Sequence, residues 1–270
     1  MTAPPTPPRI LVIAGSDSSG GAGIQADIKT ITMLGGYAMT AITAITAQNT
    51  VGVTRVDALP PEAVTAQIRA CLTDIGADAI KTGMIASAAQ VRAIGDALEG
   101  CDAPLILDPV LIASSGARLA DSDTLAAMRE RLFPRTALLT PNLDELAAID
   151  GGAPINGAEE MLARAAALSD QLGIPVLAKG GHLESDTLVD ALLRPGEDAV
   201  VMRGARIDTR HTHGTGCTLA SAIATGIGRG EGLPDAIAAA IVFVRAAIAA
   251  APGFGAGHGP LGHQAVRPSA

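Results

Sequence analysis

Short apolar runs alternate with segments of helical periodicity along most of the chain. Residues 9–14 (RILVIA) form an apolar run that ends at a glycine, which is typical of a buried strand. Residues 20–34 then place apolar side chains at helical spacing until two glycines end the segment. The same patterns predict strands at residues 37–46, 78–81, 104–108, 136–140, 175–179, 187–193 and 199–202, the last two as an antiparallel pair. They predict helices at residues 61–73, 87–98, 121–132, 142–149, 158–172, 214–227 and 234–250.

This order of elements predicts an α/β fold in which a mostly parallel sheet carries helices on both faces. The sequence contains no internal repeat and no change in composition that would mark a second domain. We therefore expect one domain over residues 9–252. A disordered Pro-rich tail is expected over residues 1–8, and a loose Gly/Pro-rich tail over residues 253–270.

The composition narrows the class of function. The chain has a net charge of −8, with three Phe, one Tyr and no Trp, so it lacks the basic patch and the stacking surface that nucleic-acid binding needs. Residues 1–9 lack the apolar segment of a signal peptide, and the Ala-rich run at 236–251 is too short to span a membrane. Three widely spaced cysteines suit a reducing compartment. We expect a cytoplasmic protein that binds neither nucleic acid nor membrane.

Polar, Gly-rich loops follow the predicted strands. They read GSDSSGGAG, AQNT, KTGM, DPV, TPNLDE and KGGH in chain order. Parallel sheets bind ligands beyond the carboxyl ends of their strands. We therefore expect these loops to meet at one edge of the sheet and to form a ligand site there.

Residues 209–217 (TRHTHGTGC) open a predicted helix. Gly214 and Gly216 let successive N–H groups point outward, and with the positive end of the helix they form the kind of anion hole that a transferring phosphoryl group needs. The helix end favours the thiolate of Cys217, which could then act as a base. The alternative interpretation is a Gly-rich turn with a small buried cysteine.

Two other loops supply charge. Asn142 and Glu145 in TPNLDE fit a helix capping box, which needs no further function. Alternatively Glu145 and Asp108 face a hydrated Mg²⁺, which usually takes one or two carboxylates besides phosphate and water oxygens. Lys179 ends a strand before two glycines, where it could reach a phosphate or simply be an exposed strand end.

The N-terminal loop contains a misleading pattern. Residues 21–26 (GAGIQA) fit a dinucleotide-binding motif, but the loop from Gly15 is too long for its tight turn, and the GK[ST] of an ATP P-loop is absent from the sequence. Asp17 and Asp27 instead bracket a loop that could admit a small polar ligand, and Gln48 could add an amide donor and acceptor.

Four other polar residues receive a structural interpretation. Only three lysines occur in the chain, and we attribute Lys29 and Lys81 to base composition in the coding DNA. His211 and His213 lack a third metal ligand, so we interpret them as loop residues.

The motifs resemble those of one family when taken in order. The series GSDSSGGAGIQADIK, ITAQNTVGV, KTGM, LDPV, TPNLDE, KGGH and THGTGCT is similar to the hydroxymethylpyrimidine kinase and phosphomethylpyrimidine kinase family of thiamine biosynthesis, within the ribokinase-like superfamily. The resemblance covers about residues 10–250 and implies a three-layer α/β/α fold. It also implies an enzyme that uses ATP to convert 4-amino-5-hydroxymethyl-2-methylpyrimidine to its monophosphate and then to the diphosphate.

The resemblance further implies roles for individual residues. Cys217 stands where most ribokinase-like enzymes carry an Asp base. The implied catalytic residues are Gly214, Thr215, Gly216 and Cys217; the pyrimidine is bound by Gly15, Asp27, Gln48, Met84 and Val110, the ATP phosphates by Asn142, Lys179 and Thr212, and Mg²⁺ by Asp108 and Glu145.

The sequence departs from the family at residues 114–117 (SSGA), where Ala117 replaces a polar or charged residue and the lysine often found before the Ser-Gly is missing. Two other functions stay open. One is a pyridoxal kinase of the same superfamily, and the other is a non-catalytic protein that senses the pyrimidine. We expect a homodimer.

Overall fold

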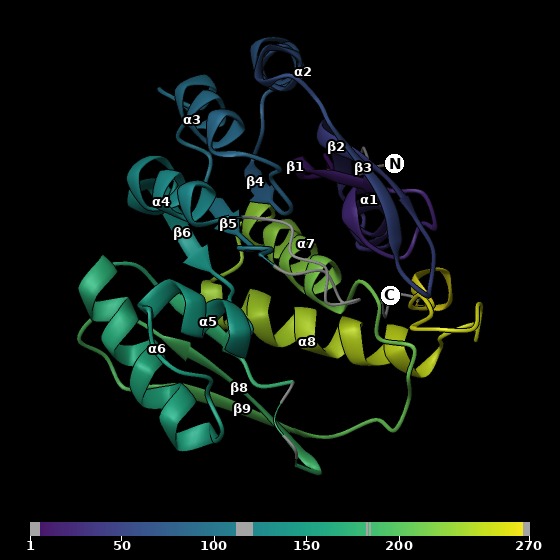
Figure 1. The fold of residues 1–270 in the computed structure, drawn as a ribbon, viewed down its shortest axis with the longest axis vertical. Helices are drawn as coiled ribbons and strands as arrows, with labels where there is room; N and C mark the ends of the chain where they lie inside the picture. Colours follow the sequence, from purple (N-terminus) through teal and green to yellow (C-terminus); the bar gives the residue numbers. More distant parts are fainter. Residues whose placement is uncertain (1–5, 112–120, 182, 184, 267–270) are drawn as a thin grey trace, which may run out of the picture.

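The computed structural model describes residues 6–111, 121–181, 183 and 185–266. Within these residues nine strands form one sheet (Figure 1). The strands are β1 (Arg9–Asp17), β2 (Tyr37–Gln48), β3 (Val53–Ala58), β4 (Ala79–Thr82), β5 (Leu105–Leu107), β6 (Thr136–Leu139), β7 (Val176–Lys179), β8 (Thr187–Leu193) and β9 (Val200–Ala205). The helices are α1 (Gly23–Met33), α2 (Pro61–Asp74), α3 (Ala88–Ala97), α4 (Ser122–Arg131), α5 (Leu143–Asp150), α6 (Ala158–Leu172), α7 (Thr215–Gly228) and α8 (Leu233–Ala249), with short 3-10 helices η1 (Phe133–Arg135) and η2 (His263–Ala265).

The sheet is mostly parallel, as predicted. Its strands follow the order β3-β2-β1-β4-β5-β6-β7-β8-β9. The strands from β2 through β7 in this order run parallel, whereas β3, β8 and β9 are antiparallel to their neighbours. The antiparallel pair predicted near the end of the sheet is thereby confirmed. The direction of winding reverses between β1 and β4, where sheets of this kind bind ligands.

Alternating residues of β1 show why the fold has three layers. Leu11 and Ile13 pack with the helices α2 to α6 on one face of the sheet, whereas Ile10 and Val12 pack with α1, α7 and α8 on the other. All four side chains are fully buried. A strand buried on both faces needs apolar residues at every position, and residues 10–14 (ILVIA) provide them.

Strand β3 was not predicted. It pairs with the end of β2 at the edge of the sheet, and most of its residues are exposed. An edge strand open to solvent does not need the continuous apolar run that identified the buried strands. Hydrophobic pattern alone therefore could not detect it.

The segment after α8 differs from the loose tail that its Gly and Pro content predicted. Leu261 and His263 are buried, and Gly262 N–H donates to the carbonyl of Ala247 in α8 (2.9 Å). The segment is ordered because it closes over the ends of α1 and α8. At the other terminus Pro8 is buried and accepts a hydrogen bond from Tyr37 N–H (2.8 Å), while residues 1–5 lie outside the described residues.

A search of the described helices finds none with the length and apolar character needed to cross a bilayer. The longest, α8, packs its apolar face under the sheet beside α7 (Figure 1).

Candidate active site

The carboxyl ends of the parallel strands bring the predicted loops to one edge of the sheet. β1 ends at Asp17, β7 ends at Lys179, and Asp108 directly follows β5. Helix α7 begins at the same edge, because Gly214 packs against the carbonyl of Gly21 so closely that a Cβ would overlap it. Segments about 200 residues apart in the chain are thus in direct contact.

The first turn of α7 has the form of an anion-binding site. Gly214 precedes it in a left-handed conformation (φ 87°), which favours glycine. No side chain caps this helix. Thr215 folds back instead, so that its hydroxyl donates to the carbonyl of Thr212 (2.7 Å). The start of the helix is therefore open to an external acceptor, and the helix dipole favours an anion.

An ion pair lies against this turn. Lys179 Nζ is 2.9 Å from Asp108 Oδ1, which also accepts a hydrogen bond from Thr140 Oγ1 (3.1 Å). A Cβ added to Gly216 would lie 3.3 Å from Lys179 Nζ and 3.5 Å from Asp108 Oδ2. Burial lowers the pKa of Lys179, but the carboxylates of Asp108 and Glu145 raise it by more. A fixed positive charge therefore stands beside the open helix end.

Glu145 serves the capping box and also faces the ion pair. Its Oε2 accepts the Asn142 N–H (2.8 Å), and its own N–H donates to Asn142 Oδ1 (2.9 Å), which confirms the capping box. Burial raises the pKa of Glu145 to about 7, with Lys179 opposing the rise and Asp108 adding to it. A carboxyl in this state takes the charged form readily when another cation approaches.

A second ion pair is buried beneath the site. Lys81 Nζ lies 3.1 Å from both carboxylate oxygens of Asp27, and Ser221 Oγ donates to Asp27 Oδ1 (2.7 Å). All three side chains are fully buried. Burial lowers the pKa of Lys81, but the charges of Asp27 and Asp108 raise it by more. Ser221 follows Cys217 by one helical turn, so the pair supports the helix directly below the thiol.

Cys217 was expected to be a thiolate favoured by the helix end, and burial opposes that form. Burial raises its pKa to about 11; Lys81 opposes the rise, and Asp27 and Asp108 add to it. Desolvation of a thiolate between two carboxylates outweighs the attraction of the helix end. The raised pKa therefore favours the thiol over the thiolate.

A histidine lies at the part of this edge formed by the ends of β1 and β2, which we call the acceptor half. His213 Nε2 lies 2.8 Å from Asp17 Oδ2 and 3.3 Å from Gln48 Nε2. Burial raises the pKa of Asp17, but hydrogen bonds from His213, Ser19 and Ala22 lower it by more. Because an ionised Asp17 only accepts hydrogen bonds, His213 must carry a proton on Nε2. His213 thus joins the loop after β1 to the segment that leads into α7.

Gly15 and Met84 lie close together beside the acceptor half. A Cβ at Gly15 would lie 3.1 Å from Met84 Sδ, and Thr43 Oγ1 donates to the Met84 carbonyl (2.7 Å). Val110 is half-buried two residues after Asp108. These contacts give the edge an apolar surface beside its polar groups.

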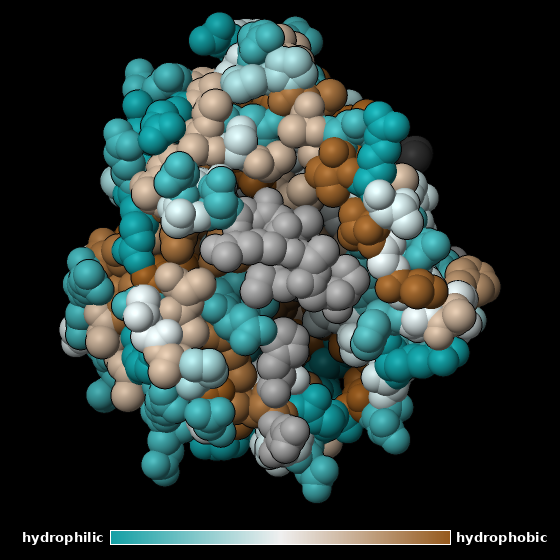
Figure 2. All heavy atoms as spheres, in the orientation of Figure 1, coloured by the Kyte–Doolittle hydropathy of each residue, from teal (hydrophilic) through white to brown (hydrophobic). Residues whose placement is uncertain are grey.

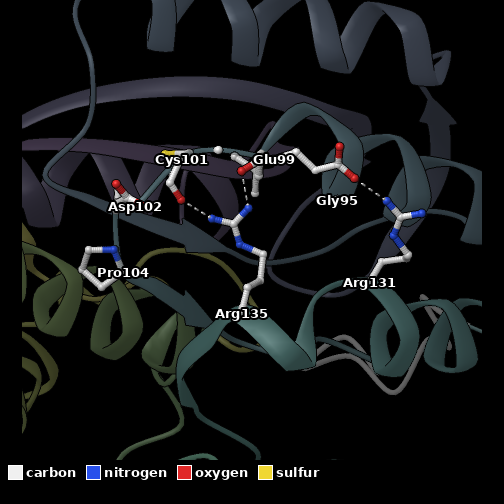
Figure 3. Close-up of a pocket in the computed structure, with 10 residues that line it drawn as sticks. Gly95, Glu99, Cys101, Asp102, Pro104, Arg131 and Arg135 are labelled. Atoms are coloured by element: carbon white, nitrogen blue, oxygen red, sulfur yellow. Dashed lines mark hydrogen bonds and ion pairs between the residues drawn. The ribbon is translucent and has the colours of Figure 1, made fainter.

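Two surface cavities lie elsewhere, beside the loop between α3 and β5. Their volumes are about 390 and 350 Å³, and both are lined by Glu99, Gly100 and Cys101. In the larger one, Arg135 donates to the carbonyls of Leu98 and Cys101 (2.7 and 3.0 Å; Figure 3). This loop precedes β5, so the cavities open at the amino end of the sheet, away from the predicted loops.

Comparison with known proteins identifies the family. The family model described as phosphomethylpyrimidine kinase matches residues 17–262. A hydroxymethylpyrimidine/phosphomethylpyrimidine kinase of Streptomyces coelicolor is 48% identical over 263 residues, which cover 97% of this chain and 96% of that protein. The chain belongs to the phosphomethylpyrimidine kinase family.

Solved structures agree with this family assignment. A phosphomethylpyrimidine kinase from Clostridium difficile 630 has a TM-score of 0.76 and 36% identity, covering 88% of this chain and 97% of that one. A pyridoxal kinase from Staphylococcus aureus, in complex with AMP-PCP and pyridoxal, has a TM-score of 0.88 and 32% identity, covering 97% and 95%. The predicted ribokinase-like α/β/α fold is confirmed.

The structure groups most of the residues that the family resemblance singled out. Asn142 is bridged to Lys179, whose N–H donates to the Pro141 carbonyl (2.9 Å), so both adjoin Asp108 and Glu145 as predicted. Their roles with phosphate and metal stay predictions. His182 and the divergent loop at residues 114–117 lie outside the described residues.

Asp27 is the residue whose placement differs most from expectation. We predicted a direct contact with the pyrimidine, but the side chain is fully buried and hydrogen-bonded to Lys81 and Ser221. Its carboxylate has no surface to offer a ligand, because its partners enclose it. The structure assigns it to the support beneath the site instead.

Sequence reasoning missed two important residues. We attributed Lys81 to base composition in the coding DNA, yet it is fully buried as the partner of Asp27. His213 looked like a loop residue, yet it is buried against Asp17. A lysine inside an apolar strand (DAIKT) was a usable signal for Lys81, because a buried lysine needs a carboxylate. No local pattern pointed to a contact between residues so far apart.

Proposed function

We propose that this chain is an ATP-dependent kinase that phosphorylates 4-amino-5-hydroxymethyl-2-methylpyrimidine to its monophosphate and then to the diphosphate, as a step of thiamine biosynthesis. Family membership over nearly the whole chain supports the activity. The observation that carries the proposal is the position of the Lys179–Asp108 pair against Gly216, at the open start of α7. It combines fixed positive charge with helix N–H groups, which is what a transferring phosphoryl group requires.

Different residues along this edge of the sheet would bind the phosphates and the pyrimidine. Lys179 and the N–H groups of residues 214–217 would bind the γ-phosphate and stabilise the charge that spreads over its oxygens. Thr212 and Asn142, which flank them, would hold the remaining phosphates. Gln48 would bind the pyrimidine beside Gly15 and Met84, with its hydroxymethyl group toward α7.

Cys217 would act late in the transfer. In a loose transition state the attacking hydroxyl keeps its proton until the phosphoryl group has largely moved, so little base strength is needed at the start. The thiol, whose pKa burial raises to about 11, would donate a hydrogen bond to the migrating phosphoryl group. As the new O–P bond forms and the bond to ADP breaks, the proton of the attacking hydroxyl would pass to an oxygen of the transferred group. Lys81, below it, would limit the cost of any thiolate that forms.

Asp108 and Glu145 would hold a hydrated Mg²⁺, which would neutralise phosphate charge. The donor set fits this ion, because the two carboxylates lie close enough that the charge of Asp108 raises the pKa of Glu145. Mg²⁺ in kinases is held largely by phosphate and water oxygens, so two carboxylates suffice.

We further propose a cytoplasmic homodimer. All three cysteines are free, as a reducing compartment would require. Apolar side chains reach the surface on the β2–β3 side of the molecule, including Ile45 and Val56, which are 50% and 42% exposed (Figure 2). Light scattering at several protein concentrations tests the dimer, and a mass equal to one chain throughout would contradict it.

An ATP-coupled assay tests the function directly. The substrates are hydroxymethylpyrimidine, its monophosphate and pyridoxal, each given to the wild type and to Cys217→Ala. We expect turnover of both pyrimidines and a large loss of kcat in the variant. Turnover of pyridoxal alone would make the chain a pyridoxal kinase, and binding without ATP consumption would make it a sensor.

A further inference from the structure

The segment from Phe254 to His263, which we call the C-terminal brace, runs back from α8 to the catalytic edge. In Figure 1 it lies next to the free end of the β2–β3 hairpin and the chain that leads into α7. It contributes no side chain to the groups assigned above. Its contacts nevertheless reach both halves of the site.

The brace first holds the turn between β2 and β3. His258 N–H donates to the Thr50 carbonyl (2.8 Å), and Gly257 N–H donates to Thr50 Oγ1 (3.3 Å). A Cβ at Gly255 or at Gly257 would overlap Thr50. Thr50 follows Gln48 by two residues, so the brace holds the turn directly after the end of β2.

The brace also holds the chain before α7. His213 N–H donates to the Gly259 carbonyl (3.2 Å), and His213 forms a β-bridge with Pro260. Further along, His263 Nε2 lies 2.8 Å from Thr218 Oγ1 in α7, with both side chains buried. The start of α7 is therefore attached to the same segment as the hairpin turn.

Core packing does not account for the contacts at the turn. Val51 and Phe254, which flank the Thr50 contacts, are 70% and 65% exposed. Burial of Leu261 would stabilise the fold equally well if the residues before it were free of the hairpin. The Thr50 contacts thus fix a distance between two loops and add little buried apolar surface.

We propose that the C-terminal brace positions Gln48 relative to the start of α7, and so sets the affinity for the acceptor substrate. It does so because one short segment is hydrogen-bonded to the Thr50 turn and to His213. The inference rests on the proposed pyrimidine kinase function for the identity of that substrate. A contact that is lost in both the bound state and the transition state raises KM and leaves kcat unchanged.

Gly257→Ala tests the brace, with Gly52→Ala as its matched control. Both glycines have negative φ, so neither substitution strains the backbone. A methyl group at 257 overlaps the Thr50 carbonyl, whereas a methyl group at 52 has no heavy atom within 4 Å. We expect Gly257→Ala to raise the KM for hydroxymethylpyrimidine about tenfold, with kcat and the KM for ATP within about twofold of the control. Thr50→Val, which replaces the hydroxyl that accepts from Gly257 N–H with a methyl group of similar size, should raise the same KM by a smaller factor.

Three outcomes would overturn the brace. The first is an equal KM for the pyrimidine in Gly257→Ala and Gly52→Ala. The second is a fall of kcat in Gly257→Ala together with a fall of its unfolding temperature, which would indicate a structural role alone. The third outcome concerns hydrogen exchange of residues 47–52, which is measured without substrate. We expect faster exchange in Gly257→Ala than in Gly52→Ala, and equal exchange in the two variants would contradict the proposal. If the wild type does not phosphorylate the pyrimidine, the proposed function fails, while the exchange comparison still decides the geometry of the brace.

Discussion

The two halves of the catalytic edge are built differently. The phosphate half, with Lys179, Asp108 and Glu145, comes from strands that are neighbours in the sheet and carries formal charges. The acceptor half, with Gln48 and His213, is joined mainly by the hydrogen bond between His213 and Asp17, which lie 196 residues apart in the chain. Charge can act from several positions, whereas hydrogen bonds require fixed geometry. We infer that the first half governs kcat and the second governs substrate affinity.

The ion pair beneath both halves should show the largest effect when it is broken. Lys81→Met leaves Asp27 buried without its cation, and removal of one partner of a buried pair costs about 3–5 kcal/mol of unfolding free energy. Urea denaturation measures this loss. The double variant Lys81→Met/Asp27→Leu, which buries no charge, should recover most of it. If the double variant is no more stable than the single one, the unpaired carboxylate is not the cause.

Lys179→Ala sharpens the comparison from the phosphate half. Loss of its charge beside the start of α7 should lower kcat about 10²- to 10³-fold, with a small change in the KM for the pyrimidine. Steady-state kinetics measures both values. Arg92→Ala, which removes an exposed cation on α3, is the control for net charge. A Lys179 variant that changes mainly the pyrimidine KM would reverse the assignment of the two halves.

His213→Leu breaks the acceptor half. It removes the donor to the ionised Asp17, and the pyrimidine KM should rise about tenfold while kcat changes less. His213→Gln keeps an N–H near the position of Nε2 and should restore most of the affinity. Equal KM values for the Leu and Gln variants would show that the hydrogen bond to Asp17 is irrelevant to binding.

The smallest expected effect is a pH dependence of stability from Glu145. Its pKa rises from 4.5 to about 7 on folding, so between these values the folded chain binds more protons than the unfolded chain. The free energy of unfolding therefore falls as the pH rises through this window. Glu145→Gln keeps a residue that suits the capping box and removes the titration, so its stability should vary less with pH. Denaturation at pH 5, 6 and 7 measures the slope, and identical slopes in both proteins would exclude Glu145 as its source.

Prediction from the sequence succeeded where one segment carries its own signal. The run RILVIA identifies a strand buried on both faces, and TPNLDE identifies the start of α5 with its capping box. Strand β3 was not predicted because its residues face solvent. The ordered structure of residues 260–263 was not predicted because it depends on contacts with α1, α7 and α8. Local composition cannot report such contacts.

The sequence by itself determined the α/β architecture, the edge at which the site forms, and the family to which the chain belongs. Those follow from periodicity and from motifs that lie within single segments. Only the tertiary structure decided that Asp27 and Lys81 pair beneath the site, that His213 holds Asp17, and that burial raises the pKa of the Cys217 thiol. Pairing and desolvation depend on which residues surround a group in space, and the chain brings these residues together only when it folds.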